Sequence, residues 1–172
     1  MRAPLPLALL LATAGCGYAF DRDRGEARLA HGTLPRVAVL PFDNESWRRG
    51  LEMRLTRLVA DEVRARSPRA PASPSEADWI VTGRILRADE RIYSEDRTDE
   101  VRESSFLVEV EVTLEDRTAD RTHGPYSIVE REPYSPRAGR FSTLDEAADE
   151  ALRDVAEKVV YWLETLEPKR DS

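Results

Sequence analysis

The clearest pattern in the chain is a strict alternation of apolar and polar residues from Ser105 to Leu114. A period of two is typical of a strand with one buried face, and here the apolar positions are Phe106, Val108, Val110, Val112 and Leu114. A polar opposite face favours an antiparallel sheet that is covered on one side only. Shorter apolar runs predict three more strands, at residues 37–40, 78–88 and 126–132. The first of these runs is apolar throughout, which predicts burial on both faces.

Two other segments have apolar residues at helical spacing. Residues 47–66 carry one apolar face, formed by Leu51, Leu55, Leu58, Val59 and Val63. Residues 143–166 carry a longer apolar stripe, and Thr143 with Glu146 fits a capping box at its start. Asn44 or Ser46 is expected to cap the first helix. The prolines at 68, 71 and 74 make the segment after it an irregular connector.

The order of these elements predicts an α/β (α+β) two-layer sandwich over residues 35–167. Both helices pack on the Phe106 face of a mostly antiparallel four-stranded sheet, in the order β-α-β-β-β-α. Gly83 shares the apolar face of its strand, which indicates a bulge or a close backbone approach. The charged segment 89–103 is expected to be a solvated hairpin extension or a mobile loop, and His123-Gly124-Pro125 a turn. Residues 168–172 are expected to form a disordered tail.

The N-terminus carries a second kind of signal. Arg2 precedes an uncharged apolar run at residues 4–14, and small residues follow, as in a secretory signal peptide covering residues 1–15. The run is too short to span a hydrocarbon core, which needs about 20 residues. Cys16 is the only cysteine in the chain, and Thr13-Ala14-Gly15-Cys16 resembles a bacterial lipobox, although Thr13 stands where Leu is usual. Cleavage between Gly15 and Cys16 would leave Cys16 as the lipid attachment site, with an S-diacylglycerol and an N-acyl group; the alternative is an ordinary secretory signal.

Residues 16–34 are then a lipidated N-terminus and tether, because the stretch after Cys16 is mostly polar. The alternative is an ordered arm along the sheet, packed through Tyr18 and Phe20.

Composition and motifs argue against several classes of function. A net charge of −7 lacks the basic field that binds a phosphate backbone, so no nucleic-acid partner is expected. Two histidines and one cysteine without metal-ligand spacing give no metal site, and no nucleophile elbow or glycine-rich phosphate loop is present. We therefore expect no catalytic residues, no cofactor and no enzyme activity.

Arginines are the remaining polar feature. Six of them lie on the second strand, its charged extension and the loop after the third strand: Arg84, Arg87, Arg91, Arg97, Arg117 and Arg121. Guanidinium groups of this kind bind the phosphates or carboxylates of an anionic glycolipid. The alternative is a solvated face that neighbouring acidic residues neutralise.

Four short motifs occur in order along the chain. They are Cys16-Gly17-Tyr18-Ala19-Phe20, then Val37-Ala38-Val39-Leu40-Pro41-Phe42-Asp43-Asn44, then Gly50-Leu51-Glu52, then Ala77-Asp78 with Gly83. Together they resemble the lipopolysaccharide-assembly lipoprotein family, LptE. The second motif is also similar to the opening of TolB N-terminal and CsgG-like domains, which are envelope interaction modules without lipopolysaccharide binding.

The first resemblance implies a function. It implies a lipid-anchored protein on the periplasmic side of the cell outer membrane that forms a plug inside the LptD β-barrel and assists lipopolysaccharide assembly and insertion. Gly17 after Cys16 is consistent with sorting to the outer membrane. The implied lipopolysaccharide contacts are basic residues at strand ends and loops, for which we take Arg84, Arg87, Arg117 and Arg121.

Overall fold

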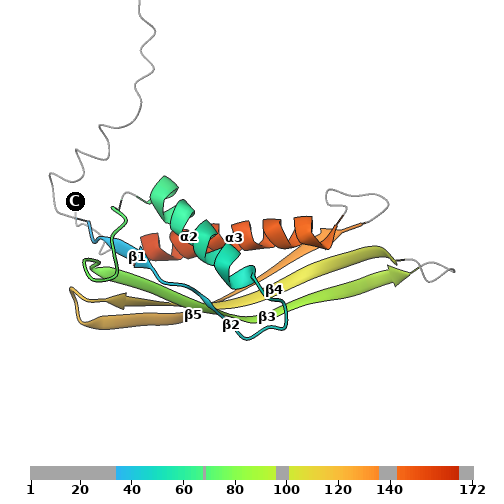
Figure 1. Ribbon diagram of the computed structural model, residues 1–172, viewed down its shortest axis with the longest axis horizontal. Coiled ribbons are helices and arrows are strands. Elements are labelled where there is room, and N and C mark those ends of the chain that lie inside the picture. The colour runs from blue at the N-terminus through green and yellow to red at the C-terminus, as the bar shows by residue number, and fades with distance from the viewer. Residues whose placement is uncertain (1–33, 68, 96–100, 136–142, 167–172) are drawn as a thin grey trace, which may run out of the picture. The chain divides into compact units, whose positions relative to one another are not determined.

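A computed structural model describes residues 34–67, 69–95, 101–135 and 143–166. Two helices lie on one side of a single sheet (Figure 1), which confirms the predicted two-layer α+β fold. The elements are β1 (Val37–Val39), β2 (Asp43–Asn44), α2 (Leu51–Arg66), β3 (Trp79–Glu95), β4 (Val101–Asp116), β5 (Arg121–Tyr134) and α3 (Leu144–Thr165).

The sheet has five strands where four were predicted. Its order is β1-β3-β4-β5, and β2 also pairs with β3. β1 and β2 run parallel to β3, whereas the other pairs are antiparallel. The extra strand lies just after Pro41, because the chain resumes pairing with β3 after the proline. The backbone N–H of Leu40 donates to Val81 (2.9 Å), and that of Glu45 donates to Ile85 (2.9 Å).

Strands β3 and β4 form a longer hairpin than the apolar pattern predicts. Residues 89–95 belong to β3 and residues 101–103 to β4, so the described part of the charged segment is a hairpin extension. Backbone bonds between the two strands satisfy the polar groups of both, and this pairing needs no apolar side chains.

The predicted turn at His123-Gly124-Pro125 is wrong, because all three residues lie inside β5. Residues 117–120 make the reversal instead. The carboxylate of Asp116 accepts the N–H groups of Thr118 (2.9 Å) and Ala119 (3.1 Å). Burial raises the pKa of Asp116, but these bonds and that from the Thr118 hydroxyl outweigh it, so the pKa is lowered. Gly124, with φ of 106°, lies at the register shift between Val112 and Leu114.

The main core lies between the helices and the alternating face of β4. Phe106 is the largest fully buried side chain, and the apolar stripes of α2 and α3 pack against the same cluster. A second cluster of Ala38, Ala77 and Ile80 is separate from the main core and includes Ala72 of the connector. Val37 belongs to the first cluster and Ala38 to the second, which confirms that this strand is buried on both faces.

The start of α3 also confirms its prediction. The Thr143 hydroxyl accepts the N–H of Glu146 (3.2 Å), and the Glu146 carboxylate accepts the N–H of Thr143 (3.2 Å). This reciprocal capping box fixes the first turn.

Candidate functional site

Asn44 organises the junction between β2 and α2. Its side-chain N–H donates to the Arg48 carbonyl (2.7 Å) and to the Glu52 carboxylate (2.6 Å). Its side-chain oxygen accepts the backbone N–H of Ser46 (2.9 Å). One amide therefore ties the loop to both the strand before it and the helix after it.

The helix begins later than predicted, and neither Asn44 nor Ser46 caps it. The N-cap of α2 is Gly50, which has φ of 90° and makes no side-chain cap. The carboxylate of Glu52 accepts the Gly50 N–H (3.0 Å). The hydrogen bond from Asn44 is the main cause of a lowered Glu52 pKa. Residues 47–50 fit the helical spacing in the sequence. The positive φ at Gly50 is not a helical conformation, so α2 begins only after this residue.

Replacing Glu52 with Gln should weaken the protein in a pH-dependent way. The folded-state pKa is lowered, so the carboxylate contributes stability above its unfolded pKa, which is near 4.3. That contribution is lost as the pH falls through the folded pKa. We expect Glu52→Gln to cost about 1 kcal/mol at pH 7, as for other helix caps. The difference from wild type should shrink towards pH 3 in urea unfolding; an equal difference at both pH values would contradict this role.

Phe42 and Gly83 meet at the same junction. Phe42 is buried, and its backbone N–H donates to the Thr56 hydroxyl (2.9 Å). A Cβ at Gly83 would overlap the Phe42 ring and lie 2.8 Å from the Glu111 carbonyl oxygen. Of the two expectations for Gly83, the close approach is therefore confirmed, whereas the nearest bulge lies between Ile85 and Arg87.

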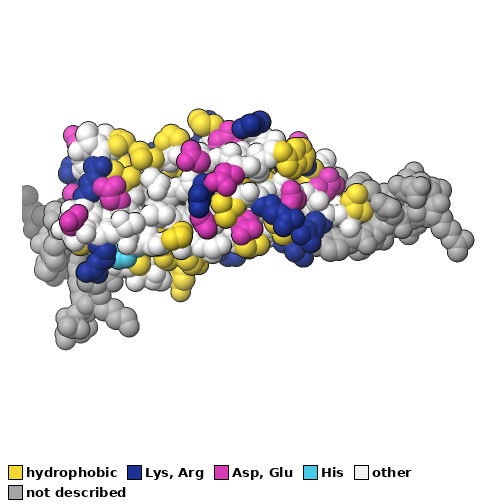
Figure 2. All heavy atoms as spheres, turned by 90° about the horizontal axis from the view of Figure 1, so that it is seen from below, with side chains coloured by type: hydrophobic (Ala, Val, Ile, Leu, Met, Phe, Trp, Pro, Cys, Tyr) yellow, Lys and Arg dark blue, Asp and Glu magenta, His cyan; other side chains and the backbone are white. Residues whose placement is uncertain are grey.

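The face of the sheet opposite the helices carries Arg84 and Arg87. Figure 2 shows this face, on which basic and acidic side chains are interspersed rather than gathered into one basic area. Arg84 donates to the Glu111 carboxylate through Nε (3.0 Å) and Nη2 (2.8 Å), and it also contacts Glu45 (3.3 Å). The hydrogen bond with Glu111 is the main cause of a raised Arg84 pKa. Arg84 and Glu111 border a hollow of about 350 Å³ that is also lined by Asp43, Thr82 and Thr113.

Arg87 is likewise paired. Its guanidinium donates to Asp89, and this bond is the main cause of a lowered Asp89 pKa. Arg84 and Arg87 lie opposite Glu111 and Glu109 of β4, so the two arginines share one region of the sheet.

Arg117 and Arg121 lie at the other end of the sheet. Arg117 follows β4 and donates to Glu115 (2.9 Å) and to the Pro74 carbonyl (2.8 Å). Arg121 pairs in register with Asp116, which also lies opposite Trp79 at the start of β3. Arg121 is exposed and forms no ion pair with another residue of the described ranges. The four predicted arginines therefore form two separate groups.

Two more residues, Arg131 and Trp47, lie in the same region as Arg87 and Asp89. Asp89 lies opposite Leu107, and Leu107 lies opposite Arg131 of β5. Arg91 follows on the same strand, and Trp47 donates a hydrogen bond to Asp89 from the preceding loop. Neither Arg131 nor Trp47 was predicted, because only the pairing of distant strands and the path of the loop bring them here.

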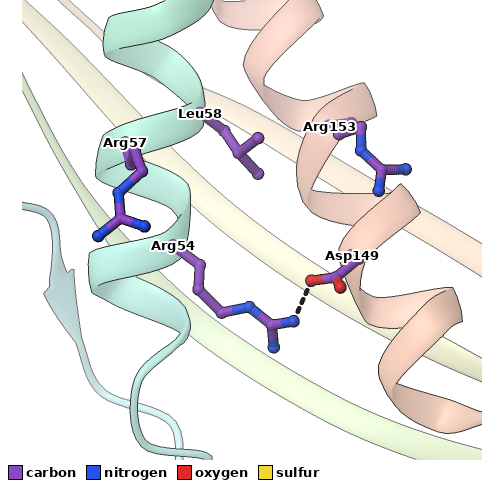
Figure 3. A pocket seen from close by; sticks show the side chains of 5 residues that line it. All are labelled: Arg54, Arg57, Leu58, Asp149 and Arg153. Carbon is purple, nitrogen blue, oxygen red and sulfur yellow. Dashed lines mark hydrogen bonds and ion pairs between the residues drawn. The ribbon is translucent and has the colours of Figure 1, made fainter.

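A second hollow, of about 260 Å³, lies between the helices. Figure 3 shows Arg54 of α2 reaching toward Asp149 of α3, with which it forms an ion pair, whereas Arg57 points away from α3. The arginines here do not converge on one point, so this hollow holds an ion pair between helices rather than an arranged ligand site.

Within the described ranges, no three His, Cys, Asp or Glu side chains are grouped to hold a metal ion. Among the same residues, no helix is long and apolar enough to cross a membrane. Gly15, Cys16 and the predicted signal and tether lie outside the described residues, as does Arg97.

The chain is a two-layer α+β domain in which both helices cover one face of the sheet and leave the other face uncovered. The chain belongs to the lipopolysaccharide-assembly family LptE, whose family model matches residues 34–161. This match favours the first of the two resemblances, and the family is one of lipopolysaccharide assembly.

Solved structures show the same fold at low sequence identity. Protein XCC0632 from Xanthomonas campestris is 12% identical with a TM-score of 0.55, over 74% of this chain and 82% of that one. The hypothetical protein CT253 from Chlamydia trachomatis is 15% identical with a TM-score of 0.50, over 72% and 94%. No protein among those with curated descriptions matches the chain.

Proposed function

We propose that this chain is an outer-membrane lipoprotein that forms a plug complex with an LptD-type β-barrel for lipopolysaccharide assembly. The observation that carries the proposal is the LptE family match over residues 34–161. The lipobox-like Thr13-Ala14-Gly15-Cys16 supports a lipid on Cys16 and a location on the periplasmic side of the membrane. Several acyl chains on one residue would anchor the chain firmly, so barrel contacts would set its orientation.

The open sheet face supports the plug arrangement. The helices already bury their apolar stripes against the opposite face, which leaves this polar face and the strand ends for a partner. An obligate complex buries about 2,000 Å² or more. The polar side chains here, including the Arg84–Glu111 pair, would then be matched by polar groups of the barrel lumen.

Affinity recovery of the full chain from detergent-solubilised outer membranes tests the complex. We expect a large β-barrel protein to be recovered in equal amount. A Cys16→Ala chain should fold but lose its membrane fraction, which tests the anchor separately. Recovery of peptidoglycan enzymes or inner-membrane complexes without a barrel would contradict the proposal and favour a TolB-like or CsgG-like role.

The lipopolysaccharide contact is proposed to involve Arg84, Arg87, Arg117 and Arg121. Because these residues form two groups, two double variants separate them: Arg84→Gln with Arg87→Gln, and Arg117→Gln with Arg121→Gln. We expect weaker lipopolysaccharide binding in at least one, measured on the purified chain. If a chain with all four arginines reversed to Glu binds lipopolysaccharide as well as wild type, these contacts are wrong.

A further inference from the structure

A small exposed patch lies along the free edge of β3. β1 and β2 pair with β3 only as far as Ile85, so beyond that residue the described part of β3 is paired with β4 on one side and has no strand on its other edge. We call Trp47, Arg87 and Arg91 the edge patch. Trp47 is 69% exposed, a high value for a large apolar side chain.

The exposure of Trp47 is imposed by its surroundings. Its indole donates a hydrogen bond to Asp89 of β3. The Arg48 guanidinium lies 4.7 Å from the centre of the Trp47 ring and 5.8 Å from that of Phe106, which is fully buried. The Arg48 carbonyl is in turn held by Asn44. The cation–π contact with Arg48 and the hydrogen bond to Asp89 therefore hold the ring at the surface.

Arginine side chains lie close to this ring. The Asp89 carboxylate already accepts hydrogen bonds from Arg87 and Trp47. Neither Arg48 nor Arg91 forms an ion pair with another residue of the described ranges. In a chain with a net charge of −7, the edge patch is thus a place where cationic and aromatic groups lie together.

We propose that the edge patch binds the phosphate-containing headgroups of an anionic phospholipid bilayer. Tryptophan places an apolar ring and a polar N–H at the level of the headgroups, and arginine there donates to phosphate. Both features lie at an exposed edge of the sheet, which reaches a flat bilayer more readily than a cleft does. Anionic headgroups also complement the local positive charge.

The predicted anchor would keep the patch close to such a surface. Under the proposed function, the lipid on Cys16 is joined to Leu34 by 18 residue steps. A chain of this length spans at most about 65 Å. The patch would then meet the membrane at high effective concentration, so a modest intrinsic affinity is sufficient.

Vesicle binding without the anchor tests the patch alone. A chain beginning at Leu34 retains the compact unit and the whole core, so it can be used directly. We expect it to sediment with vesicles of phosphatidylglycerol and phosphatidylcholine, but not with phosphatidylcholine alone. Binding should shift the tryptophan emission to shorter wavelength and reduce quenching by acrylamide. Trp47→Ala should remove both changes, because Trp79 is only 4% exposed and the Trp162 ring, on α3, is stacked on Tyr126.

Matched variants separate the patch from general surface effects. Tyr161 on α3 is 68% exposed, so Tyr161→Ala is the control for Trp47→Ala and should bind as wild type. Arg91→Gln should weaken binding about fivefold, whereas Arg57→Gln on α2 should not. Equal effects of Trp47→Ala and Tyr161→Ala, or equal binding to both vesicle types, would overturn the proposal.

Two further outcomes distinguish this proposal from the proposed function. Full-length Trp47→Ala should still recover the barrel from outer membranes. If it loses the barrel while vesicle binding stays unchanged, the patch contacts protein and the lipid proposal is wrong. Binding to lipopolysaccharide but not to phosphatidylglycerol vesicles would also overturn it.

Discussion

Gly83→Val should destabilise the protein by about 3 kcal/mol or more, since overpacking of a core typically costs 1–3 kcal/mol and backbone cannot easily yield. The new Cβ would meet the buried Phe42 ring on one side and the Glu111 carbonyl of the paired strand on the other. Relief requires either a shift of β4 or expulsion of Phe42, whose N–H is bonded to Thr56. The measurement is the free energy of unfolding in urea.

A double mutant identifies the cause. Phe42→Leu removes ring atoms that face Gly83, so Gly83→Ala should cost less in a Phe42→Leu background than in wild type. Thr82→Val, one residue away on the same strand, is the control and should have a small effect. Additive costs of Gly83→Ala and Phe42→Leu would show that the ring is not the obstacle.

Arg69→Ala should cost about 3 kcal/mol, from the loss of hydrogen bonds made by a charged group and of a cation–π contact. Arg69 is only 3% exposed. Its guanidinium donates to the Leu163 carbonyl near the end of α3 (3.0 Å) and to the Ser67 hydroxyl (3.0 Å). It also lies 4.5 Å from the centre of the Trp79 ring. One side chain thereby joins the connector, α3 and β3.

Arg69→Met separates packing from hydrogen bonding. It keeps most of the volume over Trp79 but leaves the Leu163 carbonyl without this donor, so it should lie between wild type and Arg69→Ala. Arg64→Ala on α2 removes an exposed arginine and should change stability by less than about 0.5 kcal/mol. A loss below 1 kcal/mol for Arg69→Ala would show that desolvation of the cation offsets its contacts.

Three of the four sequence motifs meet at one junction. Phe42 packs on Gly83, Asn44 bonds to Glu52, and Gly50 begins α2 with a positive φ. These residues come from separate motifs along the chain, yet each contacts another in the fold. The sequence resemblance therefore marks residues that hold β2, α2 and β3 together, and it does not by itself locate the surface that binds a partner.

The candidate arginines show where prediction from sequence ends. The strand pattern placed Arg84 correctly on the polar face, but it could not pair it with Glu111 or separate it from Arg121. Trp47 was predicted to lie in a helix, so its position beside Asp89 could not be anticipated.

The sequence by itself determined the two helices, the alternating strand β4, the capping box at Thr143 and the membership of a lipopolysaccharide-assembly family. These follow from local spacing and from short motifs, which a single chain displays directly. Only the tertiary structure decided the fifth strand, the late start of α2, the position of His123 inside β5 and the edge patch. The late start of α2 comes from the left-handed backbone at Gly50. The other three depend on register between strands, because periodicity assigns a side chain to a face but not to a neighbour.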